Sequence, residues 1–159
     1  DPVSGLEASV KAAVHGNQPV DYIVKITTGR IRGAGTDAVV YIELIGEGDV
    51  RSGPCELPSE PQYFERGATD TFEVRLPAVG PITALRIWHD SLNPSASWFL
   101  ESAEVTSCSE GLRYVFDACC WLSATGGLEK TIPTRKGSKG DKITDMRVSF
   151  FTGRARQVG

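Results

Sequence analysis

Short alternating segments separated by turn residues occupy most of the chain and leave little room for helices. In the segment 22–28, Tyr22, Val24 and Ile26 alternate with other residues and therefore share one face of a strand. Glycine, proline, asparagine or aspartate stands in nearly every gap between such segments. Many short strands with turns of this kind are typical of an antiparallel sandwich. We therefore expect an all-β fold.

The expected strands are the segments in which this alternation is clearest. They span 22–28, 38–45, 62–66, 70–76, 82–89, 98–106 and 112–117, with a further short one near 53–57. The N-terminal approach segment, residues 1–20, has a different pattern. Its apolar residues Leu6, Val10, Ala13 and Val14 fit a short amphipathic helix.

The length of 159 residues and an apolar content of 40% fit one ordinary globular domain with some additional length. No apolar run approaches the roughly 20 residues that a membrane-spanning helix needs. The N-terminus also lacks the basic and then apolar layout of a signal peptide. A mature chain would already have lost such a segment, so the compartment stays open, and a peripheral position on a membrane is compatible with this sequence.

Positive charge gathers at the C-terminal end of the chain. Residues 1–129 carry nine Lys or Arg and eighteen Asp or Glu, whereas residues 130–159 carry eight basic and two acidic residues. We expect the segment 124–145 to be a basic linker, the first part of a basic C-terminal extension. It would either touch an anionic membrane or a partner through Lys136 and Lys139 or remain a solvated connector. No aromatic residues interleave this cluster, so we expect no nucleic-acid partner.

The last segment, 146–159, returns to a strand pattern and resembles an earlier part of the chain. Without a gap, VSFFTGRARQVG at 148–159 matches VKITTGRIRGAG at 24–35 in six of twelve positions. The segment either begins a second repeat or forms a strand that closes the first domain. A second repeat would make the chain part of a tandem array, which presents repeated surfaces.

The four cysteines, Cys55, Cys108, Cys119 and Cys120, include no CxxC pair, and only two histidines accompany them. A structural zinc site is therefore not expected. Adjacent residues on a strand point to opposite faces, which disfavours a bond between Cys119 and Cys120. We expect mostly reduced, packed thiols, and leave a bond between Cys55 and Cys108 open.

Several motifs occur in one order and spacing over about 100 residues, and together they resemble the PLAT domain, also called the lipoxygenase homology (LH2) domain. They are YIVKITTG at 22–29, GAGTDA at 33–38, FERG at 64–67, DTF at 70–72, LRIWHD at 85–90 and SWFLE at 97–101. The Trp88-His89-Asp90 run is similar to polycystin-type domains, and the restart at 148 is similar to tandem PLAT arrays. One departure is Ala118, which stands where the family usually has a cysteine.

The resemblance implies an antiparallel β-sandwich of two four-stranded sheets over residues 21–123. It also implies a domain that binds lipid or protein partners, often with calcium, and that has no catalysis of its own. No GxSxG, HExxH or P-loop motif is present. His89 and Asp90 are neighbours on a strand, so their side chains diverge and cannot act as a base with its orienting group. We therefore expect no enzyme activity.

Calcium takes six to eight oxygen ligands from carboxylates, backbone carbonyls and water. Asp37 and Asp90 each border a strand, and the resemblance places both of their loops at one end of the sandwich. The further candidate ligands are Gly33, Gly35, Thr36 and Asn93. The alternative for both aspartates is a carboxylate that caps a turn by accepting hydrogen bonds from backbone N–H groups.

Trp98 and Leu92 are candidate contacts with a membrane or a partner. A tryptophan in a sandwich is by default a core residue, because aromatic burial dominates the packing energy. Trp98 follows the polar loop 91–97, however, and could instead lie at a rim together with Leu92. The sequence leaves two functions open, which are calcium-assisted membrane or lipid targeting and protein–protein interaction within a larger complex.

Overall fold

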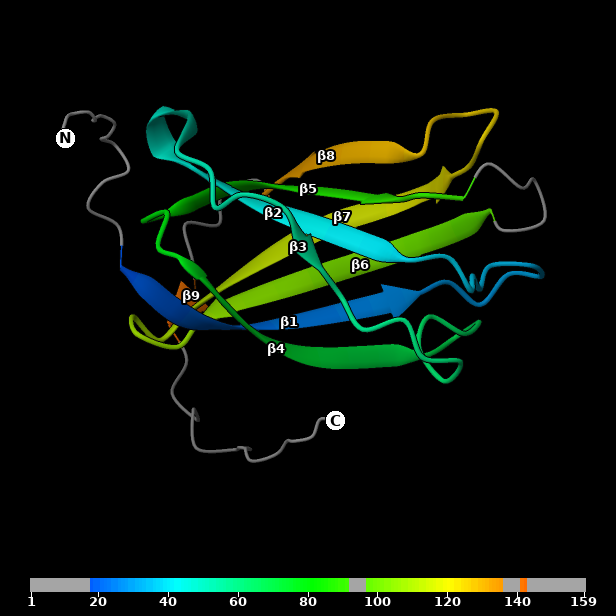
Figure 1. Ribbon diagram of the computed structural model, residues 1–159, viewed down its shortest axis with the longest axis horizontal. Coiled ribbons are helices and arrows are strands. Elements are labelled where there is room, and N and C mark those ends of the chain that lie inside the picture. The colour runs from blue at the N-terminus through cyan, green and yellow to red at the C-terminus, as the bar shows by residue number, and fades with distance from the viewer. Residues whose placement is uncertain (1–17, 92–96, 136–140, 143–159) are drawn as a thin grey trace, which may run out of the picture.

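Two antiparallel sheets pack face to face in the computed structural model, which describes residues 18–91, 97–135 and 141–142 (Figure 1). The first sheet has the order β4-β1-β6-β7-β9 and the second the order β3-β2-β5-β8. The strands of the first sheet are β1 (Pro19–Thr28), β4 (Thr69–Pro77), β6 (Trp98–Ser107), β7 (Leu112–Leu122) and β9 (Asp141–Lys142). Those of the second are β2 (Val40–Gly46), β3 (Cys55–Glu56), β5 (Ile82–His89) and β8 (Glu129–Pro133).

The all-β sandwich expected from the sequence is thus confirmed, with four strands in each sheet and the two-residue β9 added to the edge of the first. The only helical element among the described residues is one 3-10 turn, η1 (Glu47–Asp49). No helix in the described part of the chain is long and apolar enough to span a bilayer. The expected N-terminal helix and most of the basic extension fall in residues 1–17, 136–140 and 143–159, outside the described residues.

Two aromatic residues show how the inner faces form the core. Trp98, at the start of β6, is fully buried, and its indole Nε1 donates a hydrogen bond to Thr28 Oγ1 at 2.9 Å. Phe64 packs edge-on against Trp98, with ring centroids 5.3 Å apart. The expectation that Trp98 contacts a membrane or partner is therefore wrong, because the indole has both its apolar surface and its N–H satisfied inside the sandwich.

The expected strand at 62–66 is also wrong, since this stretch forms turns. Phe64 has a left-handed backbone (φ 62°), and its N–H donates to Asp70 Oδ2 at 2.8 Å. Burial of the ring in the core and capping by the carboxylate together hold this unusual conformation. The adjacent aromatic residues Tyr63 and Phe64 therefore mark an anchored turn rather than a strand.

The sandwich extends beyond the expected boundary at residue 123. Residues 129–133 lie within the expected linker, but form β8 and pair with β5. Ile132 is buried in the core opposite Leu85, which explains why this segment is ordered although the sequence predicts a linker. The expectation of a solvated connector is thus wrong for β8.

All four cysteines are free, so the bond left open between Cys55 and Cys108 does not form. Cys119 is exposed and has a left-handed backbone (φ 48°) at a point where the register between β6 and β7 shifts. Burial raises the pKa of the Cys55, Cys108 and Cys120 thiols, which favours the neutral, less reactive form.

The sandwich has two distinct ends. The loops that follow β1, β3, β5 and β7 gather at one end, which we call the tip (Figure 1). β1 begins at the opposite end, and β9 pairs with Leu112 and Arg113 at the start of β7, also at that end. The described chain therefore enters and leaves the domain away from the tip.

Replacement of Thr28 by valine tests the bond to the Trp98 indole. Thr28→Val keeps the shape of the side chain but leaves a buried N–H without its acceptor, which should lower the free energy of unfolding by about 1–3 kcal/mol. Thr27→Val is the matched control, because Thr27 Oγ1 contacts only Thr69 Oγ1 in an exposed pair. Urea denaturation measures both, and equal losses in the two variants would contradict this role.

Candidate functional site

Asp37 and Asp90 lie at the tip, on loops that border neighbouring strands. Val40 pairs with His89 in the β2–β5 ladder, which places the residues just beyond this pair next to each other. Asp90 Oδ1 accepts a hydrogen bond from Val39 N at 3.3 Å. One carboxylate oxygen of Asp90 is thus engaged in capping, and the other has no hydrogen-bond partner among the described residues.

The turn beside Asp37 is capped by its neighbour. Ala38 N donates to Thr36 Oγ1 at 3.1 Å, and Thr36 is buried. The exposed Asp37 carboxylate makes no hydrogen bond or ion pair with the described residues. The capping alternative therefore describes Asp90 in part but not Asp37, whose oxygens face solvent.

The loop after β1 is tied to the loop before β4 by three backbone hydrogen bonds. Thr28 N donates to Ala68 O at 2.9 Å, Gly67 N to Gly29 O at 2.8 Å, and Thr36 N to Phe64 O at 3.0 Å. Because both loops cross between the two sheets, these bonds join the sheets at the tip. Gly35 makes the approach possible, since a Cβ there would lie 3.0 Å from Phe64 O and from Arg66 N.

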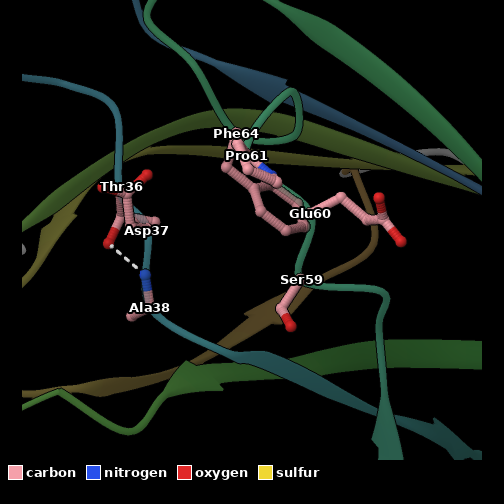
Figure 2. A pocket seen from close by; sticks show the side chains of 7 residues that line it. All are labelled: Thr36, Asp37, Ala38, Ser59, Glu60, Pro61 and Phe64. Atoms are coloured by element: carbon pink, nitrogen blue, oxygen red, sulfur yellow. Dashed lines mark hydrogen bonds between the residues drawn. The ribbon is translucent and has the colours of Figure 1, made fainter.

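A small pocket of about 160 Å³ lies between these loops (Figure 2). It is lined by Thr36, Asp37, Ala38, Ser59, Glu60, Pro61 and Phe64. Figure 2 shows the Glu60 side chain extending away from Asp37, so the two carboxylates do not converge. Among the described residues, no group of three or more His, Cys, Asp or Glu could hold a metal ion. A calcium ion at the tip would therefore have the carboxylates of Asp37 and Asp90 and nearby backbone carbonyls as its ligands. So few carboxylates suit a modest affinity for calcium.

Among the described residues of the tip, the most exposed apolar side chain is Ile31, with 47% of its surface accessible. It lies between the exposed Arg30 and Arg32 in a turn closed by Ala34 N donating to Ile31 O at 3.1 Å. Gly33 completes the turn with a left-handed backbone (φ 79°). The sequence selected Gly33 as a candidate ligand but did not single out Arg30, Ile31 or Arg32. The available signal was that the strand alternation stops at Gly29, so that Ile31 has no inner face to occupy.

The remaining candidates divide into two groups. Gly33, Gly35 and Thr36 share the tip with Asp37, although Gly35 and Thr36 are packed against the neighbouring loop. Leu92, Asn93, Lys136 and Lys139 lie outside the described residues.

Both outer faces of the sandwich carry aromatic pairs. On the first sheet, Phe99 and Trp121 meet edge-to-face with centroids 5.2 Å apart, and Trp121 is 39% exposed. On the second sheet, Tyr41 stacks on Trp88 at 5.5 Å, and the Arg86 guanidinium lies 4.3 Å from the Trp88 ring centroid. Aromatic pairs of this kind are common in protein interfaces.

Ion pairs hold Arg86 over Trp88. Arg86 contacts Glu129 at 2.9 Å and Glu43 at 3.1 Å, and Arg51 contacts the same Glu43 at 3.2 Å. Bonds to Glu129 first and Glu43 second raise the pKa of the guanidinium, and the pKa of Glu129 is lowered in turn by Arg86. The network orders this face but presents no free charge.

His89 serves the structure of the tip. The ring is buried, its Nε2 is 2.8 Å from Leu122 O, and its Nδ1 accepts from Ser91 N at 3.2 Å. An imidazole that accepts at Nδ1 donates from Nε2, so both ring nitrogens have partners. His89 therefore joins β5 to the end of β7 across the two sheets.

Comparison with known families agrees with this architecture. A model of the PLAT/LH2 domain matches residues 22–131, more than half of the chain. The chain belongs to the PLAT/LH2 family. It is 44% identical over 138 residues to lipoxygenase homology domain-containing protein 1 of Homo sapiens, covering 83% of this chain and 7% of that protein. It is 35% identical over 124 residues to Homo sapiens polycystin-1-like protein 1, covering 75% and 4%.

Both groups of relatives expected from the motifs are thus confirmed, and the chain spans less than a tenth of the length of these PLAT proteins. Among solved structures, coral 8R-lipoxygenase superposes with a TM-score of 0.63 at 23% identity, over 72% of this chain and 17% of that one. At this identity the likeness shows the shared fold alone.

A methyl group at Gly35 tests whether the tip loops are held together. Gly35→Ala places a Cβ against the backbone of Phe64 and Arg66, so the loops must separate, at a cost of about 1–3 kcal/mol. Gly126→Ala is the control at the same end, because its nearest atom is the movable Ser123 hydroxyl. Urea denaturation and amide exchange at Gly67 report the effect. Unchanged exchange in Gly35→Ala would show that the loops are not coupled.

Proposed function

We propose that this PLAT domain is a non-catalytic module that docks on a membrane surface through its tip, with assistance from calcium. The observation that carries the proposal is the exposed Ile31 between Arg30 and Arg32, on the same end as Asp37 and Asp90. An apolar side chain flanked by arginines suits the boundary between headgroups and acyl chains. The apolar group enters, and the cations remain with the phosphates.

The donors at the tip support a role for calcium. Among the described residues, the Asp37 carboxylate makes no hydrogen bond and one oxygen of Asp90 has no partner. Carbonyls of Gly33 and Gly35, with Asn93, would complete the set. A bound calcium ion supplies two positive charges that neutralise these carboxylates. Coral 8R-lipoxygenase is described as activated by calcium through a C2-like domain, a property of that enzyme which gives this proposal a precedent.

The basic residues that follow β8 would contribute to the same membrane contact. Lys136 and Lys139 would add attraction to anionic lipid, on the order of 1 kcal/mol for each residue near the surface. The domain would then be peripheral to a membrane. If residues 146–159 begin a second repeat, one of the two alternatives that the sequence leaves open, the longer protein would carry several such modules.

Ile31→Ala tests the docking site. Loss of the branched side chain from the membrane interface should weaken partitioning onto vesicles about 5- to 30-fold, according to how deeply the side chain inserts. The measurement is sedimentation with vesicles of phosphatidylcholine and phosphatidylserine, with calcium and with chelator.

Val50→Ala is the matched control, because Val50 is 38% exposed but follows η1, beside Gly46 at the end of β2 away from the tip. It should bind like the unmodified domain. Absence of vesicle binding by the unmodified domain under every condition would refute the proposal, and equal losses in the two variants would refute the placement at the tip.

A second candidate function, protein–protein interaction, is favoured by the exposed Trp121 on an outer face, where it packs on Phe99. In a tandem array the neighbouring surface belongs to a similar domain, so the probe is a second copy of this domain. We expect concentration-dependent self-association in sedimentation velocity that Trp121→Ala weakens and Ile31→Ala does not. A domain that stays monomeric at all concentrations would count against this interface.

A further inference from the structure

The outer strands of the two sheets differ in how much unpaired backbone they present. Among the described strands, β3 and β9 have two residues each, and β8 has five and ends in Pro133. In contrast, β4 has nine residues and pairs on one side only, with β1. Its register with β1 contains no shift, so no bulge turns the strand away from a further neighbour. The edge of β4 is therefore the longest regular sheet edge in the described part of the chain (Figure 1).

Alternate residues of β4 direct their backbone groups to this free edge. Ala78 N donates to Gln18 O at 3.0 Å, a bond that continues the β1–β4 register past the end of β4. Residues that bond to one neighbour alternate along an antiparallel strand with residues that face the other side, so the even-numbered residues of β4 bond to β1. The N–H and C=O groups of Thr71, Glu73 and Arg75 therefore point away from β1, and they have no backbone partner in any other described segment.

The side chains at the middle of this edge are complementary to a copy of themselves. Glu73 and Arg75 are exposed, lie on the outer face and have opposite charges. Arg75 contacts Asp21 of β1 at 3.0 Å, whereas Glu73 forms no ion pair with the described residues. Val74 lies between them and packs against the core, but it is only partly buried. The edge thus presents free backbone groups, a partly open apolar side chain and one charge of each sign.

We propose that two copies of this domain associate by antiparallel pairing of β4 with β4, about a two-fold axis at Val74. In this register Glu73 of each copy lies opposite Arg75 of the other, so opposite charges meet on both sides of the axis. The same two residues carry outward-facing backbone groups, so they form hydrogen-bonded pairs. At the axis itself the two Val74 side chains meet and cover each other. The first sheets of the two copies then form one continuous sheet.

The neighbouring registers are disfavoured by charge. An axis at Glu73 places two glutamates opposite each other, and an axis at Arg75 places two arginines opposite each other, which destabilises a strand pair. An axis between two residues sets an outward-facing backbone group against an inward-facing one and loses the hydrogen bonds. Charged residues on an edge strand usually prevent pairing. Here their order along the strand selects one register and one partner, a second copy of the same strand.

Charge reversal at the two positions tests the register. Glu73→Arg and Arg75→Glu each bring like charges opposite each other on both sides of the axis, so each should weaken self-association about tenfold. An equimolar mixture of the two variants should restore association, because each strand then meets one of opposite charge. The measurement is sedimentation velocity of the 159-residue chain over a range of concentrations. Glu47→Arg is the control, since it makes the same change of charge at an exposed residue of η1, between strands of the second sheet, and should associate like the unmodified domain.

Hydrogen exchange gives an independent readout with an internal control. The amides of Thr71 and Glu73 face the free edge, so they should exchange quickly in dilute solution and slowly where the domain is associated. The amides of Phe72 and Val74 bond to β1 and should be protected at both concentrations. Equal exchange of the Thr71 and Glu73 amides at the two concentrations would contradict pairing at this edge.

The outcomes separate this inference from the functions proposed above. If the unmodified domain stays monomeric, or if mixing the two charge variants does not restore association, pairing through β4 is overturned. If Trp121→Ala abolishes association and Glu73→Arg leaves it unchanged, the outer face around Trp121 is the interface and pairing through β4 is again overturned. None of these results concerns vesicle binding by the unmodified domain, so membrane docking at the tip is tested separately.

Discussion

The hydrogen bonds between the loop after β1 and the loop before β4 are the constraint on which the rest of the tip depends. Each loop crosses from one sheet to the other, so the bonds at Thr28, Gly67 and Thr36 join the sandwich at its end as well as ordering the loops. With these bonds in place, Asp37 and the turn around Ile31 project to solvent and cannot collapse onto the core. The same bonds bring Arg66 beside Gly35.

Most of the fold was predictable because its information is local. Alternation in the segments around Val24, Ile87 and Val105 sets their inner faces, and the structure buries all three residues completely. The placement of the Asp37 and Asp90 loops at one end came from the family resemblance and not from periodicity. Periodicity shows which face of a strand is buried, whereas the pairing of Val40 with His89 brings together residues far apart in the chain.

The wrong expectations share a cause, which is that tertiary contacts outweighed local pattern. Phe64 looks like a strand residue but occupies a left-handed turn, because Asp70 caps its N–H and its ring enters the core. β8 carries one glutamate and one lysine and has only Ile132 to bury, yet β5 offers it a free edge. Trp98 follows a polar loop, but Thr28 supplies the acceptor that lets its indole go inside. Such partners are visible only once the strands are assembled.

The end at which the chain enters and leaves the domain affects how many domains of a longer protein can bind one membrane. β1 starts and β9 ends at the end of the sandwich away from the tip, so a preceding or following segment of a longer polypeptide would be attached at that end. In a tandem array connected at that end, the tips of several domains could face one bilayer at the same time. The overall affinity for the membrane would then exceed that of a single domain, since each bound domain raises the effective concentration of the next at the surface.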